Sequence, residues 1–272
     1  MEFTRKEIAK LIYNNLKSNE IGLKKQFSAH KNEIGFFYID DLLPTEIALE
    51  IHKNFPNTKE TVQRKSIREK KFTAFQMDKY NSLLEEVIYA FQDEKIVQLV
   101  AEICEIDTVF PDEFLYAGGL SLMEKGNFLN PHLDNSHDKD RNRWRVLNLL
   151  YYVTPDWELE NGGNLEIWPK GLDEKQVTIT SKFNRLAVMA THKKSWHSVS
   201  KVTANKVRCC VSNYYFSDEP LKETDSFHVT TFRGRPQEKL KDTVLQIDNG
   251  IRSLVRRIFK KGVRENPHQY KK

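Results

Sequence analysis

The chain has 272 residues, of which 39% are hydrophobic and 30% charged, a composition typical of one globular unit rather than of a disordered or fibrous protein. The N-terminus lacks the apolar run of a secretory signal, and no window approaches the roughly 18 apolar residues that a spanning helix needs, so we expect a cytoplasmic protein. Cys104, Cys209 and Cys210 are too few for a disulfide framework and lack zinc-type spacing, so we expect them in the core.

The net charge of +5 is unevenly distributed along the chain. Residues 252–272 contain eight Lys or Arg and one Glu, so this tail carries +7 and the preceding residues carry −2. Basic residues without interleaved aromatics or a known nucleic-acid-binding motif give little support for a nucleic acid partner, and none is expected.

Residues 1–112 are predicted to form a mainly helical support. Thr4 is placed to cap a first helix, because apolar residues follow it at helical spacing. Thr45 is expected to cap a second helix after Pro44. The other elements expected in this part are a strand at residues 35–40 and helices at residues 82–92 and 94–105.

Residues 113–220 change to short runs of β-branched and aromatic residues, separated by Gly and Pro. Such closely spaced strands are typical of an antiparallel sandwich or barrel. We therefore expect one α+β unit, with helices packed outside a jelly roll, or double-stranded β-helix. The runs are FLYAGGLSLME, RVLNLLYYVTP, GNLEIWP, KQVTITS, NRLAVMAT, SVSKVTA and VRCCVSNYYFS.

Residues 221–272 are expected to form a C-terminal extension with a basic amphipathic helix, weakened at Gly250. In the favoured interpretation its apolar stripe packs on the core and the charges face water. Peripheral contact with an anionic membrane surface is the alternative. The stripe consists of Leu240, Val244, Ile247, Ile251, Leu254 and Ile258, and the basic residues beside it are Arg252, Arg256, Arg257, Lys260 and Lys261.

A metal site is indicated by His132 and Asp134, which share one face if they lie in a strand. Such a pair alone is more often a solvated surface. His197, in a later strand-like segment, adds a third ligand, and two His with one carboxylate suit Fe(II) with coordination positions left open for catalysis. Arg208, at the head of an alternating strand, can hold a carboxylate through two parallel hydrogen bonds.

Two blocks of sequence, covering about residues 114–218, resemble the catalytic core of Fe(II)/2-oxoglutarate-dependent oxygenases, and most closely the prolyl hydroxylase domain type. The order of the motifs is far more specific than any single motif. They are H-x-D-N, YYVTPDW, NGGNLEIWPKG and FNRL, followed by a distal His and an Arg. The blocks are PHLDNSHDKDRNRWRVLNLLYYVTPDWELENGGNLEIWPKG and SKFNRLAVMATHKKSWHSVSKVTANKVRCCVSNYYFSDE.

The resemblance implies that His132, Asp134 and His197 are the catalytic iron ligands. It also implies that Arg208 and Tyr152 hold the far carboxylate of the cosubstrate 2-oxoglutarate, with O2 as the other cosubstrate and ascorbate as an additional reductant. Tyr152 is also explained as an ordinary core aromatic of a strand.

The sequence departs from the family pattern at two places. Leu122 or Met123 stands where the prolyl hydroxylase type usually has a tyrosine, so one cosubstrate contact is missing or supplied elsewhere. The span from His197 to Arg208 is about two residues longer than usual, which makes Lys206 a competing anion partner, although Arg208 matches the strand register.

The implied reaction is hydroxylation of a substrate with release of succinate and CO2. A prolyl or other residue of a protein is one candidate substrate, and a small molecule, glycan or lipid-linked saccharide is the other. Basic and aromatic residues near the expected entrance suit an anionic or sugar group. They are equally consistent with an exposed, solvated loop. A cupin-like metal- or sugar-binding protein is the non-enzyme alternative, disfavoured because such sites usually have more histidines. The entrance residues are Arg141, Arg143, Trp144 and Arg145.

Overall fold

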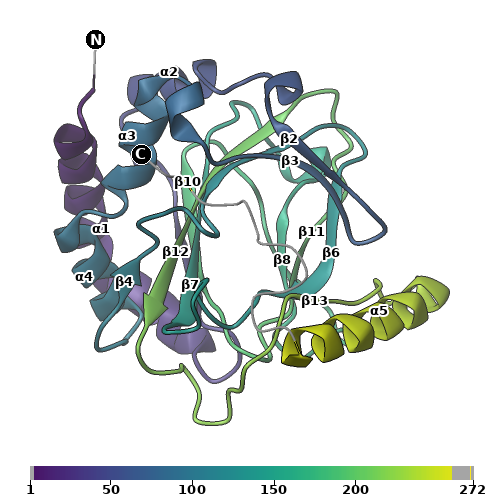
Figure 1. Ribbon diagram of the computed structural model, residues 1–272. Helices are drawn as coiled ribbons and strands as arrows, with labels where there is room; N and C mark the ends of the chain where they lie inside the picture. Colours follow the sequence, from purple (N-terminus) through teal and green to yellow (C-terminus); the bar gives the residue numbers. More distant parts are fainter. Residues whose placement is uncertain (1–2, 259–269, 271–272) are drawn as a thin grey trace.

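The computed structural model describes residues 3–258 and Tyr270. Within these residues the chain forms helices that flank a large curled sheet (Figure 1). The helices are α1 (Arg5–His30), α2 (Thr45–Lys53), α3 (Ser82–Ala90), α4 (Glu94–Ile103) and α5 (Lys239–Ile258). The strands are β1 (Phe36–Ile39), β2 (Val62–Lys65), β3 (Glu69–Ala74), β4 (Phe110–Pro111), β5 (Gly119–Met123), β6 (Phe128–Leu133), β7 (Trp144–Tyr152), β8 (Leu165–Ile167), β9 (Val177–Ile179), β10 (Arg185–Ala190), β11 (His197–Val199), β12 (Arg208–Ser217) and β13 (Thr231–Phe232).

The helix starts follow local capping rules, with one exception. Thr4 caps α1 as expected, because its hydroxyl accepts from the backbone N–H of Glu7 while the Glu7 carboxylate accepts from that of Thr4. The expected cap at Thr45 is wrong. Thr45 is already the first helical residue of α2, and Pro44 precedes it without a side-chain cap, which suits a segment whose φ is fixed by proline.

The first part of the chain contributes more strand than the sequence indicated. The hairpin β2–β3 was not expected, yet β3 pairs with both β5 and β6 and so belongs to the central sheet. In β3, Lys71 and Thr73 alternate with Phe72 and Ala74, the period-2 pattern of a strand with two different faces. Residues 1–112 are therefore not only helical support.

The sheet has the strand order β1-β10-β7-β12-β5-β3-β6-β11-β8-β9, and every pairing within it is antiparallel. Figure 1 shows β7, β10 and β12 on one wall and β6, β8 and β11 on the facing wall. This confirms the expected α+β class with a jelly-roll core. Side chains that point inward from the two walls meet in the interior, where the candidate site lies.

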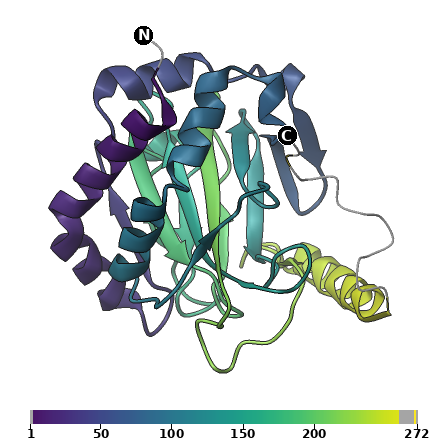
Figure 2. The same cartoon turned by 60° about the vertical axis from the view of Figure 1, so that its left-hand side comes forward.

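Helices α1 to α4 lie together along one side of the sheet (Figure 2). Their apolar faces join β7, β10 and β12 in the main hydrophobic cluster, which places the structural core outside the barrel interior. Cys104, Cys209 and Cys210 are buried and free, as expected for small core residues. A second, smaller apolar cluster, which includes Tyr152, Leu165 and Met189, joins strands of the two walls.

Helix α5 is present, but the expected packing of its apolar stripe on the core is wrong. Leu240, Val244, Ile247 and Ile251 are 88%, 52%, 61% and 60% exposed, whereas Leu245 is fully buried. The helix is attached through its other face, which carries Asp242, Asp248, Asn249 and Arg252 and makes ion pairs and hydrogen bonds with residues 68 and 230–234. The side chains of Leu254, Arg256, Arg257 and Ile258, together with Lys260 and Lys261, lie outside the described residues. None of the described helices is long and apolar enough to cross a membrane.

Candidate metal centre and cosubstrate cavity

The structure brings His132, Asp134 and His197 together inside the barrel. His132 lies near the end of β6, Asp134 follows that strand, and His197 begins β11, where it is the direct partner of His132. One ligand atom from each side chain lies within 4.8 Å of the others. The Nε2 atoms of His132 and His197 are 3.6 and 3.7 Å from the two carboxylate oxygens of Asp134. Two imidazoles and one carboxylate on one side of a point match the ligand set of a facial Fe(II) site.

Backbone carbonyls orient both imidazoles. Nδ1 of His132 lies 3.0 Å from the carbonyl oxygen of Asn130, and Nδ1 of His197 lies 2.9 Å from that of Ser195. Each Nδ1–H therefore donates to the backbone, which leaves Nε2 of each ring as the unprotonated nitrogen that faces the carboxylate. This is the tautomer that a metal ligand needs.

The charge states of these groups also suit a cation. Burial opposes ionisation of Asp134, but the adjacent imidazoles of His132 and His197 and the guanidinium of Arg145 hold its pKa well below its usual range. Burial, followed by the neighbouring His132, lowers the pKa of His197 to about 4, although Asp134 opposes this shift. A carboxylate beside a neutral imidazole is the protonation state in which such side chains bind a divalent metal.

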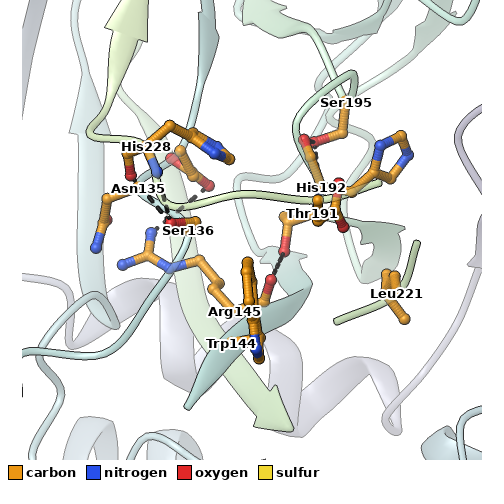
Figure 3. A pocket seen from close by; sticks show the side chains of 11 residues that line it. Asn135, Ser136, Trp144, Arg145, Thr191, His192, Ser195, Leu221 and His228 are labelled. Carbon is orange, nitrogen blue, oxygen red and sulfur yellow. Dashed lines mark hydrogen bonds and ion pairs between the residues drawn. The ribbon is translucent and has the colours of Figure 1, made fainter. Parts of the chain in front are cut away.

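Arg145 was expected near a solvated entrance, and the structure buries it instead beside Asp134. It is 6% exposed, its Nη1 is 3.7 Å from Oδ2 of Asp134, and its guanidinium lies over the ring of Tyr214 at 4.5 Å. The hydroxyl of Thr191 donates to the Arg145 carbonyl at 2.9 Å (Figure 3). Because its Nε has no hydrogen-bond partner, this buried cation has a donor available for a bound molecule.

A small cavity of about 10 Å³ beside Arg145 is lined from the segments around Ser136, His192 and His228. Figure 3 shows these lining side chains. The Ser136 hydroxyl accepts from the backbone N–H of His228, which ties the loop after the metal ligands to segment 227–230. This space suffices for about one water molecule. The cavity is therefore too small to hold a ligand larger than water.

A second cavity of about 110 Å³ extends from the three ligands into the barrel, and we call it the inner cavity. Arg208 lies in its wall, 3% exposed, and its Nε has no hydrogen-bond partner. Two further atoms of residues that line the inner cavity, Asn148 Oδ1 and Thr73 Oγ1, are also buried without hydrogen-bond partners. Unpaired buried polar atoms are costly unless a ligand satisfies them, and an anion beside Arg208 does so. The inner cavity thus fits a small dicarboxylate that reaches from the metal to Arg208.

Tyr152 is adjacent to Arg208, although it does not line the inner cavity. The guanidinium carbon of Arg208 is 5.3 Å from the centre of the Tyr152 ring, and the buried Tyr152 hydroxyl has no hydrogen-bond partner. Lys206 is exposed in the turn before β12, so its competing assignment as the anion partner is wrong. Met123, the register partner of Arg208, lines the cavity, whereas Leu122 belongs to the outer core. Of these two residues, Met123 is therefore the one that faces the site.

Several further side chains of the inner cavity were missed in the sequence. Lys71 and Thr73 come from β3, a strand whose alternating pattern was overlooked between two helical segments. Tyr214 comes from β12. The period-2 alternation from Arg208 through Ser212 and Tyr214 was the signal that could have identified them.

The C-terminal extension also contributes to the site. Phe232 of β13 pairs with His132 of β6 and stacks on its imidazole, with ring centroids 5.2 Å apart. The side chain of Asn249 on α5 binds both the N–H and the carbonyl of Phe232, at 3.0 and 2.5 Å. Helix α5 therefore holds the strand that covers His132, one of the candidate metal ligands.

Residues 118–216, the part of the chain that contains this site, match the family model of the 2OG-Fe(II) oxygenase superfamily. The chain thus carries a 2OG-Fe(II) oxygenase domain. Together with the fold, the match identifies a 2-oxoglutarate-dependent dioxygenase, and the family implies Fe(II), 2-oxoglutarate and O2. No curated protein matches the chain.

Solved structures with the same fold include prolyl hydroxylases. A prolyl 4-hydroxylase of Phytophthora capsici is 17% identical, with a TM-score of 0.55, and the match covers 96% of this chain and 82% of that one. A prolyl hydroxylase of Trichoplax adhaerens, solved with a peptide fragment of hypoxia inducible factor, is 20% identical, with a TM-score of 0.51 and coverage of 75% and 92%. HygX of Streptomyces hygroscopicus, solved with nickel and 2-oxoglutarate, is 11% identical, with a TM-score of 0.51 and coverage of 71% and 86%.

Proposed function

We propose that the chain is a hydroxylase in which His132, Asp134 and His197 hold Fe(II) while Arg208, assisted by Tyr152, binds the far carboxylate of 2-oxoglutarate. The observation that carries this proposal is the inner cavity, which has the three ligands at one end and a buried guanidinium at the other. Iron and 2-oxoglutarate, when bound, supply the oxidation chemistry. One oxygen atom of O2 enters the substrate C–H bond as a hydroxyl, and the other enters succinate as CO2 is released.

The residues of this chain orient these reactants and exclude water. The carbonyls of Asn130 and Ser195 fix the imidazoles, so that the metal is held without rearrangement of the site. Arg208 fixes the far end of the cosubstrate and thereby orients its keto acid end toward the metal. Because His132, His197 and Arg208 are at most 4% exposed, their interactions are not weakened by bulk solvent.

The acceptor substrate belongs to one of two classes. The shared fold with prolyl hydroxylases, one of which was solved with a peptide, supports a residue of a protein. The many basic side chains around the mouth of the site, described below, favour instead a small anionic molecule or lipid-linked saccharide. The family match favours both of these over a cupin-like binding protein.

The test is anaerobic loading with Fe(II) and 2-oxoglutarate, followed by measurement of succinate after exposure to O2. We expect the wild type to form succinate and Arg208→Met to need a much higher 2-oxoglutarate concentration while it retains its metal content. Lys206→Met, in the exposed turn before the same strand, is the matched control and should behave as the wild type. Equal 2-oxoglutarate dependence of wild type and Arg208→Met would refute the assignment, and absence of succinate from the wild type would refute the function.

A further inference from the structure

A wide cleft lies over the metal ligands on the side opposite Arg208, and we call it the outer cleft. Its volume is about 560 Å³, within the usual range for a small-molecule site. His132 and Asp134 line both the outer cleft and the inner cavity, whereas Arg208 and His197 line only the inner one. A substrate in the outer cleft therefore reaches the reacting centre without displacing the cosubstrate.

The outer cleft is strongly basic. Among the described residues that line it, three are carboxylates, Glu69, Asp134 and Asp138. Seven are cations, and they come from the β2–β3 hairpin, the loop after β6, the start of β7 and helix α5. These cations are Arg64, Arg68, Lys71, Lys139, Arg141, Arg145 and Arg252.

Some of these cations pair with neighbouring acids. Glu69 pairs with Lys71 at 3.1 Å, and Asp248 of α5 binds both Arg68 and Arg252. With Asp248 included, seven cations face four carboxylates, so a net charge of three remains. A divalent metal and a doubly charged 2-oxoglutarate cancel each other and leave this excess unchanged.

The excess is local, because residues 1–251 as a whole carry a net charge of −2. Cations gathered in a concave, partly desolvated site focus the potential there and attract anions. The side chain of Arg64, on β2, makes none of the hydrogen bonds or ion pairs identified among the described residues, and it is only partly exposed. A solvated basic surface does not need guanidiniums that converge on a cavity from four separate segments.

We propose that the substrate carries a phosphate or a similarly dense anionic group, which binds the outer cleft while a neighbouring carbon faces the metal. This inference rests on the proposed hydroxylase function, since it names the substrate class of that site. Guanidiniums bind phosphate oxygens through paired, charge-assisted hydrogen bonds. This preference explains why four of the seven lining cations, in addition to the buried Arg145, are arginines.

A phosphate group has two sources, a soluble metabolite and a lipid headgroup. Helix α5 bears on the second, since Arg252 lines the outer cleft while Leu240, Val244, Ile247 and Ile251 of the same helix are exposed. An apolar helix face beside a basic site is the arrangement by which proteins lie on anionic membranes. Both sources are therefore tested.

The experiment compares binding of fructose 1,6-bisphosphate and of fructose to the full chain loaded anaerobically with Fe(II) and 2-oxoglutarate. Flotation with phosphatidylcholine vesicles, with and without phosphatidic acid, tests the lipid source. The test variant is Arg64→Gln with Arg141→Gln, in the outer cleft. The matched control is Lys10→Gln with Lys25→Gln, which makes the same change of charge on the exposed face of α1.

We expect the bisphosphate or the anionic vesicles to bind the wild type, with affinity falling about 10-fold or more in the cleft variant and less than about twofold in the control, because charge-assisted contacts are lost only in the former. Binding of the bisphosphate indicates a soluble source, and binding of the vesicles alone indicates a lipid. Failure of both to bind, equal binding by both variants, or equal binding of fructose overturns the inference. Succinate release by the wild type without any acceptor is measured separately, so that failure of the oxygenase function is recognised as such.

Discussion

His197 lies directly opposite His132 in the antiparallel β6–β11 pair, and their ring centroids are 4.1 Å apart. Side chains of paired residues on neighbouring strands lie on the same face of the sheet. The register of two strands that are distant in sequence therefore sets the spacing of the two imidazoles. Asp134, just beyond the end of β6, completes the group.

This geometry predicts that each of the three side chains is needed for metal binding. Replacing His132 or His197 by Ala is expected to reduce the affinity for Fe(II) by more than about 100-fold, because loss of an outer hydrogen-bond partner of a ligand alone costs about 10- to 100-fold. The measurement is metal content after anaerobic dialysis. His137→Ala is the control, since His137 lines the outer cleft but is not one of the clustered ligands. Equal metal loss in all three variants would argue against the assignment.

The turn at Gly162 and Gly163 makes a second prediction, which concerns Arg208. Gly163 has φ +65, and a Cβ built there lies 3.0 Å from Cδ of Arg208 and from Val202. Gly163→Ala is therefore expected to displace the guanidinium and raise the KM for 2-oxoglutarate about 10-fold, the effect of losing roughly one good hydrogen bond to a charged group. Metal content should stay the same.

Gly171→Ala provides the matched control for this variant. Gly171 also has a positive φ, +86, but a Cβ added there meets no atom within 4 Å. Both substitutions introduce the strain of a positive φ, of about 1–3 kcal/mol, but only Gly163→Ala adds contact with Arg208. If both variants raise the KM equally, the effect comes from strain and not from the position of Arg208.

The ligand cluster and Arg208 could be predicted from the sequence because their evidence is local and ordered: a His and an Asp two residues apart, a distal His, and an Arg that begins an alternating strand. Lys71 and Thr73 were missed, because the hairpin that carries them is rich in charged residues and only Phe72 and Ala74 mark the apolar side of its short alternating pattern. Its position in the sheet depends on pairing with β5 and β6, which no local pattern reveals.

Helix α5 shows a different limit of sequence analysis. Its apolar periodicity predicted a helix, and a helix is present, but periodicity does not determine which face packs on the protein. Here the polar face packs, because Asp242 and Asp248 find arginine partners and Asn249 binds the backbone of Phe232. Such long-range partners are visible only in the folded structure.

This orientation of α5 predicts opposite outcomes for two leucines. Leu245 is fully buried beside Met123 and Phe232, so Leu245→Ala is expected to destabilise the docked helix by about 2–4 kcal/mol. Leu240 is 88% exposed, so Leu240→Ala should change stability by no more than about 0.5 kcal/mol. Hydrogen exchange of the α5 amides measures this local stability directly. Equal protection in the two variants would mean that α5 is not attached through Leu245.

His192 predicts a pH dependence of stability that is independent of the metal ligands. Burial lowers the pKa of this imidazole from 6.5 to about 4, and its Nδ1 accepts a hydrogen bond from the backbone N–H of Lys194 at 3.2 Å. Since the pKa is lower in the folded state, the unfolded chain binds the proton first as pH falls. The stability that the neutral ring provides is therefore complete above pH 6.5 and is lost progressively as pH falls toward about 4.

The corresponding loss is about 3.5 kcal/mol at most, since the pKa falls from 6.5 to about 4 and each pKa unit is worth about 1.4 kcal/mol. It is measured by denaturant unfolding at a series of pH values in wild type, in His192→Gln and in His30→Gln, which changes a partly exposed histidine. The free energy of unfolding should fall less steeply below pH 6.5 in His192→Gln than in the other two proteins. Because other carboxylates and histidines titrate alike in all three, the difference in slope isolates His192. Parallel curves for all three proteins would show that His192 accepts a proton in the folded state as readily as in the unfolded chain.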